Sequence, residues 1–244
     1  MICEESTMPI KASDYILPLV IGKKNFRNPF AQLNRFVGTA FYIGANGVIA
    51  TCGHIASTPA NDENLIAYDL NLQRFLKLER LQIHPEMDFA IARTGIKHNK
   101  YLKLVKTETH PIELGTSVSS FGYINAGRVG TDLRLEDKYF KGYISFIGTN
   151  PDTTLSCRTV CELSFPTLNG FSGAPVFFEN KNSLVGMLYG NRESKIEVFS
   201  NTMVEIKGKA VTKKHPRSMA LGLMHTVNDI VTFIEDMGIK IKGG

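Results

Sequence analysis

The sequence predicts an all-β fold that ends in one α-helix. Its apolar runs are mostly short, rich in β-branched and aromatic residues, and separated by Gly, Asn and Pro. This pattern is typical of a β-sandwich or β-barrel. Helical periodicity is found only near the end, where residues 226–229 resemble a capping box and Gly238 is a stop signal. The apolar stripe between them consists of Val227, Ile230, Val231, Phe233, Ile234 and Met237.

The composition is that of a soluble globular protein with a substantial core. Of the 244 residues, 43% are hydrophobic and 21% are charged, and the net charge is +5. This length allows one large domain or two small ones. No apolar run is long enough to span a membrane, and the N-terminus is acidic where a secretory signal would be basic. We therefore expect no membrane contact.

The cysteines favour a reducing compartment. The four residues, Cys3, Cys52, Cys157 and Cys161, form no evident disulfide framework. Cys157 and Cys161 would need two further ligands at suitable spacing to bind zinc. We expect a cytoplasmic protein without metal or cofactor.

The first half of the chain contains a strong hairpin signal and a histidine directly after it. After an arm over residues 1–15 and a strand over 16–21, the runs 36–43 and 48–51 are joined by a turn ending in Asn-Gly. Gly53 then leads to His54, which we expect at the rim of a barrel or sheet. The alternative is a structural histidine.

A single carboxylate directly precedes the next apolar run. Strands are expected over 65–69 and 72–84, and Asp88 follows, just before Phe89-Ala90-Ile91-Ala92. A partly buried carboxylate needs donors, and an imidazole N–H is a suitable one. The alternative is a strand-end cap.

The second half is again rich in strand signals. Residues 94–111 are predicted to form a strand and a linker, and hence a boundary. The strands predicted after it are 116–123, 127–135, 139–147, 154–163, 174–178, 183–189, 195–206 and 218–224. Residues 191–217 form a lysine-rich excursion within this half.

The stretch from Gly170 to Pro175 favours a nucleophile beside an anion site. Ser172 lies between Phe171 and Gly173, with Gly170 two residues before it. A bend at Gly170 would bring the N–H groups of Gly170 and Ser172 together next to the serine hydroxyl. The alternative is a tight turn before a buried strand.

The order His54, Asp88, Ser172 separates the known serine-hydrolase folds. An α/β-hydrolase runs Ser, Asp, His, and its elbow precedes a helix. The His, Asp, Ser order is that of the chymotrypsin-like fold. Four segments carry a resemblance to that family: Thr51-Cys52-Gly53-His54, Asp88 to Ala92, Gly170-Phe171-Ser172-Gly173-Ala174-Pro175, and Leu184-Val185-Gly186-Met187. Over residues 16–238 the sequence resembles a trypsin/chymotrypsin-like serine peptidase, of the HtrA-like bacterial type without transmembrane or PDZ segments.

The resemblance implies two packed antiparallel β-barrels followed by a C-terminal helix. The N-terminal barrel would span 16–108 and the C-terminal barrel 109–225, with an arm over 1–15 and the helix and tail over 226–244. Ser172 would be the nucleophile, His54 the base and Asp88 its orienting carboxylate, ahead of His84 as an alternative base. The N–H groups of Gly170 and Ser172 would form the oxyanion hole.

Two departures from the family pattern lead to predictions, one on activation by cleavage and one on the side chain preferred before the scissile bond. Phe171 replaces the aspartate that pairs with a new N-terminus, so we expect no activation by N-terminal cleavage. The specificity pocket would have Pro166 at its floor, Thr167 beside it, and a wall of Tyr189, Gly190 and Asn191. Because none of these is acidic, small or medium apolar side chains are expected before the scissile bond.

The leading hypothesis is an intracellular serine endopeptidase acting on a protein or peptide partner. The basic excursion 191–217 would favour an acidic docking surface on that partner, although a plain solvated hairpin is the alternative. A second hypothesis is a peptide-binding module on the same fold, catalytically silent or gated by a ligand. We expect no nucleic-acid binding, because aromatic residues are not interleaved with the basic ones.

Overall fold

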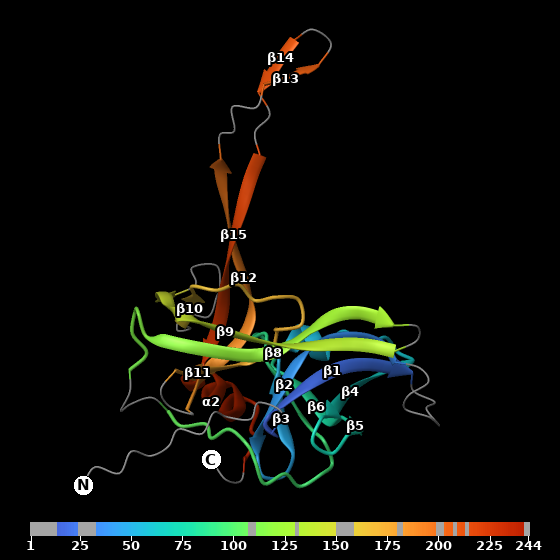
Figure 1. Cartoon of the computed structure of the whole chain (residues 1–244). Helices are drawn as coiled ribbons and strands as arrows, with labels where there is room; N and C mark the ends of the chain where they lie inside the picture. The colour runs from blue at the N-terminus through green and yellow to red at the C-terminus, as the bar shows by residue number, and fades with distance from the viewer. Residues whose placement is uncertain are drawn as a thin grey trace, which may run out of the picture.

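The computed structural model describes residues 14–23, 33–106, 111–129, 132–149, 159–179, 183–198, 203–206, 209–212 and 215–241. These residues form a seven-stranded sheet, a closed six-stranded barrel and a C-terminal helix (Figure 1). The predicted all-β fold with a terminal helix is confirmed. No helix in the described ranges is both long and apolar enough to cross a membrane.

The N-terminal sheet is an open half-barrel in the order β5-β4-β1-β2-β3-β7-β6, in which all neighbouring strands are antiparallel. Its strands are β1 (Ile16–Lys23), β2 (Leu33–Gly44), β3 (Val48–Thr51), β4 (Glu63–Asp69), β5 (Arg74–Lys77), β6 (Glu79–Ile83) and β7 (Ala90–Arg93). The single strand predicted over 72–84 is two strands, β5 and β6, because they pair with different neighbours.

The C-terminal barrel closes in the order β10-β15-β12-β11-β8-β9. Its strands are β8 (Ser117–Val129), β9 (Asp132–Thr149), β10 (Thr159–Leu163), β11 (Pro175–Phe178), β12 (Leu184–Val198) and β15 (His215–Thr226). The strand predicted over 127–135 is wrong, because residues 127–129 continue β8 and residues 132–135 begin β9. A register shift between Asn125 and Arg128, with Gly127 at a φ of +104°, lets β8 continue through the glycine as a bulge.

The hairpin of β12 and β15 is longer than the sequence predicts. The two strands pair from Gly186 opposite Thr226 at the barrel end to Val198 opposite His215 at the far end. The hairpin therefore leaves the barrel as a two-stranded ribbon (Figure 1). Beyond it, β13 (Met203–Ile206) and β14 (Lys209–Thr212) form a separate two-stranded sheet.

The C-terminal helix α2 (Val227–Asp236) packs against β12 and β15 and reaches the core of the N-terminal half. Thr226 caps it in the predicted capping box, accepting the N–H of Asp229. The buried side chains of α2 belong to the core of the seven-stranded sheet, and the Phe233 ring lies 5.5 Å from the Phe89 ring. A second core cluster, which includes Phe171, fills the barrel.

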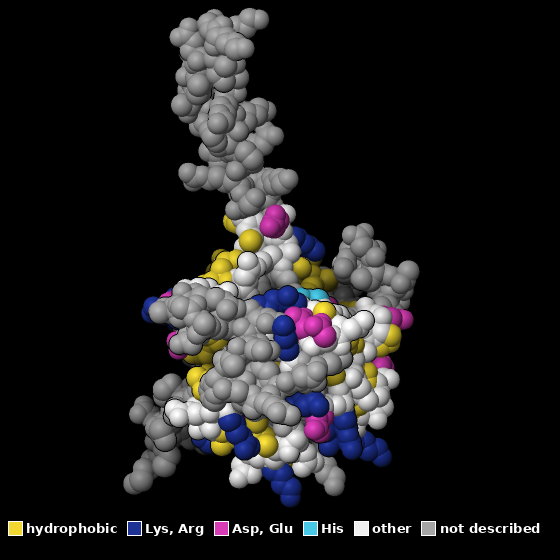
Figure 2. Space-filling view, turned by 90° about the vertical axis from the view of Figure 1, so that its right-hand side faces the viewer, with side chains coloured by type: hydrophobic (Ala, Val, Ile, Leu, Met, Phe, Trp, Pro, Cys, Tyr) yellow, Lys and Arg dark blue, Asp and Glu magenta, His cyan; other side chains and the backbone are white. Residues whose placement is uncertain are grey.

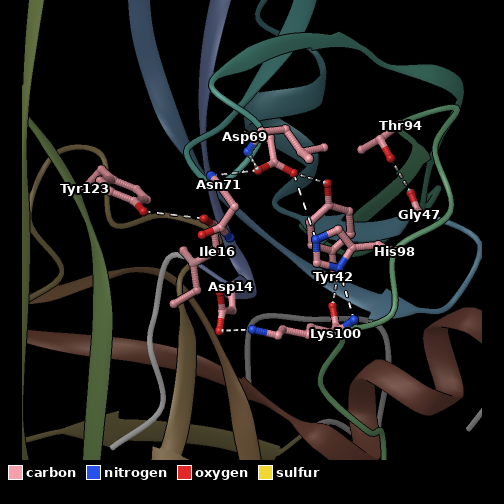
Figure 3. Close-up of polar contacts among 11 residues, drawn as sticks. Asp14, Ile16, Tyr42, Gly47, Asp69, Asn71, Thr94, His98, Lys100 and Tyr123 are labelled. Carbon is pink, nitrogen blue, oxygen red and sulfur yellow. Dashed lines mark hydrogen bonds and ion pairs between the residues drawn. The ribbon is translucent and has the colours of Figure 1, made fainter.

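A polar cluster around Asp69 fastens the segment after β7 to the sheet (Figure 3). The side chain of Asp69 is buried, and it accepts the Tyr42 hydroxyl at 3.2 Å and the N–H of Asn71 at 2.9 Å. The His98 ring stacks on Tyr42 at 4.0 Å. Burial and the charge of Asp69 raise the pKa of Tyr42. Side-chain contacts thus hold residues 94–106, where the predicted strand is absent.

Along the chain, the last strand of the seven-stranded sheet ends at Arg93 and the first strand of the barrel begins at Ser117. The change from sheet to barrel therefore lies near the predicted boundary. The division of the chain into domains at 16–108 and 109–225 stays a prediction, as do the separate arm over 1–15 and the tail over 226–244. Most of that arm lies outside the described residues.

Candidate active site

His54 lies on a one-turn helix rather than at a plain strand end. The helix α1 (Gly53–Ala56) follows β3 after the extended residue Cys52. A Cβ atom at Gly53 would lie 3.3 Å from Asp88 Oδ1 and from Phe89 N. The glycine therefore permits a close approach of α1 to the segment that carries Asp88.

Both carboxylate oxygens of Asp88 contact His54. Asp88 Oδ1 accepts the His54 backbone N–H at 2.7 Å, and Oδ2 lies 2.7 Å from His54 Nδ1. A carboxylate can only accept, so Nδ1 carries the proton and the lone pair of the neutral ring is on Nε2. The side chain of His54 is 48% exposed, which leaves its ring accessible from solvent.

The contact with His54 keeps Asp88 ionised. Burial by itself would raise the pKa of the Asp88 carboxyl, but the hydrogen bonds from the His54 ring and backbone outweigh it. The pKa of Asp88 is therefore below its usual value. A charged Asp88 in turn favours the Nδ1–H tautomer of His54.

His84 is structural in this arrangement. It is buried, and its Nδ1 accepts the backbone N–H groups of Glu86 and Met87 at 3.3 and 3.1 Å. These bonds shape the turn that leads to Asp88. On sequence alone, His84 ranked below His54 as a candidate base, and no sequence pattern indicated this role in forming the turn.

Two consecutive tight turns form the loop that contains Ser172. Phe171 N–H donates to Leu168 C=O at 2.8 Å, and Ala174 N–H donates to Phe171 C=O at 2.8 Å. The third residue of each turn has positive φ, +102° at Gly170 and +84° at Gly173. Positive φ at this position is the mark of a type II turn.

Neither glycine in these turns can be replaced without collision. A Cβ atom at Gly170 would collide with the Phe36 ring and the Tyr123 carbonyl, and one at Gly173 with the Thr39 carbonyl. The glycines therefore allow the Ser172 loop to lie directly against both halves of the protein.

Thr39 and Leu188 fix the position of this loop. Thr39 N–H donates to Ser172 C=O at 2.9 Å, and Thr39 Oγ1 donates to Gly170 C=O at 2.7 Å. Leu188 C=O accepts Gly173 N–H at 2.8 Å and also Cys52 Sγ at 3.3 Å. The Leu188 carbonyl thus links Gly173, the residue after Ser172, to Cys52, which lies two residues before His54.

The structure therefore brings Ser172, His54 and Asp88 to one junction between the sheet and the barrel. His54 and Asp88 are in direct contact. Among the described residues, the Ser172 hydroxyl makes no hydrogen bond with His54. Sequence reasoning missed Thr39 and Leu188, whose partners are more than a hundred residues away in the chain.

The predicted pocket residues Thr167, Gly190 and Asn191 lie together. Asn191 Oδ1 accepts Thr167 N–H at 2.6 Å, and Asn191 Nδ2 donates to Thr167 C=O at 2.7 Å. Thr167 Oγ1 donates to Gly190 C=O at 2.8 Å. We call this three-bond contact the Asn191 clasp; it ties Thr167, the neighbour of Pro166, to the opposite predicted wall.

Tyr189 and Phe171 are used in packing. The Tyr189 ring stacks on His225 at 4.2 Å, and burial raises the pKa of its hydroxyl to about 12. Phe171 is fully buried and its ring meets that of Phe140 edge-on at 5.2 Å. The residue before Ser172 is thus anchored in the barrel core by apolar contacts.

Three potential metal ligands lie close together at this junction. The ligand atoms of Cys52, His54 and Asp88 are within 4.8 Å of one another. However, burial and the charge of Asp88 raise the pKa of the Cys52 thiol well above its usual value. The neutral thiol donates to Leu188, and the other two groups bind each other.

Comparison with known families decides the classification. Residues 38–187, which include His54, Asp88 and Ser172, match the family described as "Trypsin-like peptidase domain". This match covers more than half of the chain. The chain belongs to the trypsin-like peptidase family.

Solved structures of HtrA-type proteases share the fold. The HtrA-type protease AlgW with a decapeptide has a TM-score of 0.58 and 16% identity, and covers 93% of this chain and 66% of its own. AlgW with a tripeptide has the same TM-score and identity, covering 93% of this chain and 62% of its own. The protein spans less than two thirds of the length of these AlgW chains.

The MamO protease domain from Magnetospirillum magneticum is also similar. Its TM-score is 0.52 at 15% identity, and the match covers 88% of this chain and 94% of that domain. At these identities the likeness shows the fold. No curated protein sequence matches this trypsin-like chain.

Proposed function

We propose that this trypsin-like protein is a serine endopeptidase in which Ser172, His54 and Asp88 form the catalytic triad. The observation that carries the proposal is the double contact of Asp88 with His54. It orients the ring and leaves the lone pair on Nε2, which is the tautomer that a general base requires.

In this mechanism Ser172 Oγ attacks the substrate carbonyl as its proton passes to His54 Nε2. The tetrahedral intermediate collapses, the C–N bond breaks, and His54 gives the proton to the leaving amine. Water then attacks the acyl ester, with its proton passing to His54, and the acid product leaves as Ser172 regains its proton. Asp88 stays ionised and stabilises the imidazolium.

The backbone N–H groups of Gly170 and Ser172 are the proposed oxyanion hole. The type II turn at Leu168–Phe171 supports this assignment. Compared with a type I turn, it reverses the direction of the peptide between Asn169 and Gly170, and therefore of the Gly170 N–H. Each such donor contributes roughly 3–4 kcal/mol to transition-state stabilisation in comparable enzymes.

The proposed specificity pocket is formed by Pro166, Thr167, Tyr189, Gly190 and Asn191. No acidic side chain among them would hold Lys or Arg. The Asn191 clasp draws the walls together. We therefore expect cleavage after small or medium apolar side chains.

The substrate is proposed to be a protein or peptide with an acidic docking surface. Residues 191–217 contain seven Lys or Arg and three Glu, so they carry most of the net charge of +5. On the face shown in Figure 2, by contrast, acidic side chains lie among the basic ones of the described body. Bound peptides in the AlgW structures support a peptide ligand. The buried, unpaired thiols of Cys52 and Cys161 support a reducing, cytoplasmic setting.

A second candidate is a peptide-binding module whose catalysis is silent or ligand-gated. It is favoured by the missing hydrogen bond between Ser172 Oγ and His54 in the described residues, although such bonds often form only with substrate. Intact mass after treatment with a fluorophosphonate distinguishes the two. A single adduct that is lost in Ser172→Ala supports the peptidase, and a folded chain without an adduct supports the binding module.

A further inference from the structure

A buried thiol lies beside the proposed catalytic pair and takes no part in the proposed reaction. The Cys52 Sγ atom and the ligand atoms of His54 and Asp88 lie within 4.8 Å of one another. Cys52 is fully buried, and its thiol lies against the Leu188 carbonyl and the Gly173 backbone. In the part of the chain that the structure describes, no other three His, Cys, Asp or Glu side chains converge in this way.

The three ligand types of this cluster are those that Zn²⁺ prefers in proteins. Zn²⁺ binds thiolate sulfur at about 2.3 Å and imidazole nitrogen or carboxylate oxygen at about 2.0–2.2 Å. In a tetrahedral site the ligand atoms are then roughly 3.3–3.6 Å apart. His54 Nδ1 and Asp88 Oδ2, now 2.7 Å apart, would separate slightly, and the Cys52 sulfur would move toward them by at most about 1 Å. Side-chain rotations of this size need no change of fold.

The charges of the cluster match those of a divalent ion. One Zn²⁺ with a thiolate, a carboxylate and a neutral imidazole has no net charge, so the buried site needs no further counter-ion. Without the ion, the Cys52 thiol keeps its proton and donates to Leu188. Zn²⁺ replaces that proton, and binding releases it to solvent.

The cluster can be reached from solvent through two of its three members. The side chains of His54 and Asp88 are 48% and 28% exposed. Gly53, between the first two ligands, has no side chain; a Cβ atom there would lie 3.3 Å from Asp88 Oδ1. An ion can therefore approach from the side of the His54 ring and meet the buried sulfur behind it.

We propose that Cys52, His54 and Asp88 form an inhibitory Zn²⁺ site. An ion bound at His54 Nδ1 takes the lone pair of that atom, so the ring proton is placed on Nε2. An Nε2–H group can donate but cannot accept the proton of Ser172. The metal-bound state therefore has no general base, and the carboxylate of Asp88 is used by the ion. The inhibition rests on the proposed function, whereas the binding of Zn²⁺ does not.

The site selects among metal ions by its sulfur ligand. Thiolate favours Zn²⁺ and the chemically similar Co²⁺ and Cd²⁺, whereas Mg²⁺ and Ca²⁺ require oxygen ligands. Three protein ligands leave the fourth position of a tetrahedral ion to water. Removal of the ion by a chelator returns the proton to the thiol and restores the contact of His54 with Asp88.

Binding is tested on the full chain with Co²⁺, because a thiolate-to-cobalt charge-transfer band reports a Co–S bond directly. Zn²⁺ affinity is then measured by displacement of Co²⁺. Cys52→Ser keeps a donor for the Leu188 carbonyl but removes the sulfur, and Cys52→Ala is a second variant should the first fail to fold. Cys161→Ser is the matched control, because Cys161 is also a buried, free thiol.

We expect the charge-transfer band in the unchanged protein and in Cys161→Ser, and its loss in Cys52→Ser. Zn²⁺ affinity should fall at least about a hundredfold in Cys52→Ser, since loss of even an outer partner of a ligand costs about tenfold to a hundredfold. His54→Ala should weaken the band as well. A band that persists in Cys52→Ser, or that is unaffected in His54→Ala, would overturn the site.

Inhibition is tested by the rate of fluorophosphonate labelling, measured by intact mass with and without Zn²⁺. Each rate is compared with the metal-free rate of the same variant. At a Zn²⁺ concentration about ten times Kd, roughly one tenth of the protein is free of the ion, so labelling should slow about tenfold and recover with EDTA. The same concentration should slow Cys52→Ser less than about twofold, and Mg²⁺ should slow neither.

The two measurements separate failure of the site from failure of the peptidase. Equal slowing of the unchanged protein and Cys52→Ser would overturn the inference, because the ion would then act without the thiol. Unslowed labelling of a protein that shows the cobalt band would overturn the inhibitory role. If no variant is labelled even without metal, the peptidase proposal fails, and the cobalt band alone decides whether the three residues bind the ion.

Discussion

The backbone N–H of Thr39 donates to the carbonyl of Ser172 across the junction of the sheet and the barrel, at 2.9 Å. The Thr39 hydroxyl reinforces this contact by donating to Gly170 C=O at 2.7 Å. A residue of β2 thereby holds the loop that contains the proposed nucleophile and oxyanion hole. The position of the Ser172 loop depends on the N-terminal sheet as well as on the barrel.

Replacing Thr39 with Val should misplace this loop while keeping the side-chain shape. The lost hydroxyl leaves Gly170 C=O without its donor, which costs about 1–2 kcal/mol of stability. We expect fluorophosphonate labelling to slow about tenfold. Thr94→Val is the matched control, because its hydroxyl donates to Gly47 C=O away from the site. Equal labelling rates in both variants would contradict the role of Thr39.

Stability at acid pH should depend on Asp88. The folded-state pKa of Asp88 is lowered, so its contribution is fully present above the unfolded pKa of about 3.9 and is lost as pH falls through the lower folded value. Urea unfolding between pH 2 and 6 should show a smaller fall in the free energy of unfolding for Asp88→Asn than for the unchanged protein. Parallel curves would mean that the contact with His54 adds nothing to stability.

Gly170→Ala should abolish labelling through strain and collision together. The new Cβ would meet the Phe36 ring and the Tyr123 carbonyl at a φ of +102°. Gly95→Ala is the control, because Gly95 has a φ of +71° but no atom within 4 Å of an added Cβ. The control should lose about 1 kcal/mol of stability and keep its labelling rate. A fully reactive Gly170→Ala would argue against this turn as the oxyanion loop.

Asn191→Ala should widen the specificity of cleavage. Removing the side chain breaks two bonds to Thr167, so the walls of the proposed pocket can separate. Profiling on a peptide library should then show at least a fivefold gain for Leu or Phe over Ala before the scissile bond. Asn125→Ala, at the bulge in β8, serves as the control. An unchanged profile would place the pocket elsewhere.

The sequence was sufficient for the fold class because local signals agreed with each other. The alternation and punctuation of the strands, the capping box at Thr226 and the order of His54, Asp88 and Ser172 all pointed to one fold. The contact of His54 with Asp88 could be expected on the same grounds. The family match and the folded chain bear out the fold, while the catalytic roles stay proposals.

Other features depend on contacts that no local pattern encodes. The extra length of β12 comes from its pairing with β15, and residues 94–106, which form no strand, are held by the cluster around Asp69. The link between Cys52 and Leu188 joins residues 136 positions apart. The Asn191 clasp likewise needs the barrel to close before Thr167 and Asn191 meet. Such tertiary contacts override local propensity.

The position of Phe233 has a consequence for synthesis of the protein on the ribosome. Its ring lies 5.5 Å from that of Phe89, the residue next to Asp88, and 5.2 Å from that of His84. Synthesis proceeds from the N-terminus at about 5–20 residues per second, so Phe233 emerges more than a hundred residues after Asp88. The core beside the proposed catalytic carboxylate is therefore completed only after Phe233 has been synthesised. The order of synthesis would therefore delay cleavage of proteins by the nascent chain until this part of the core is complete.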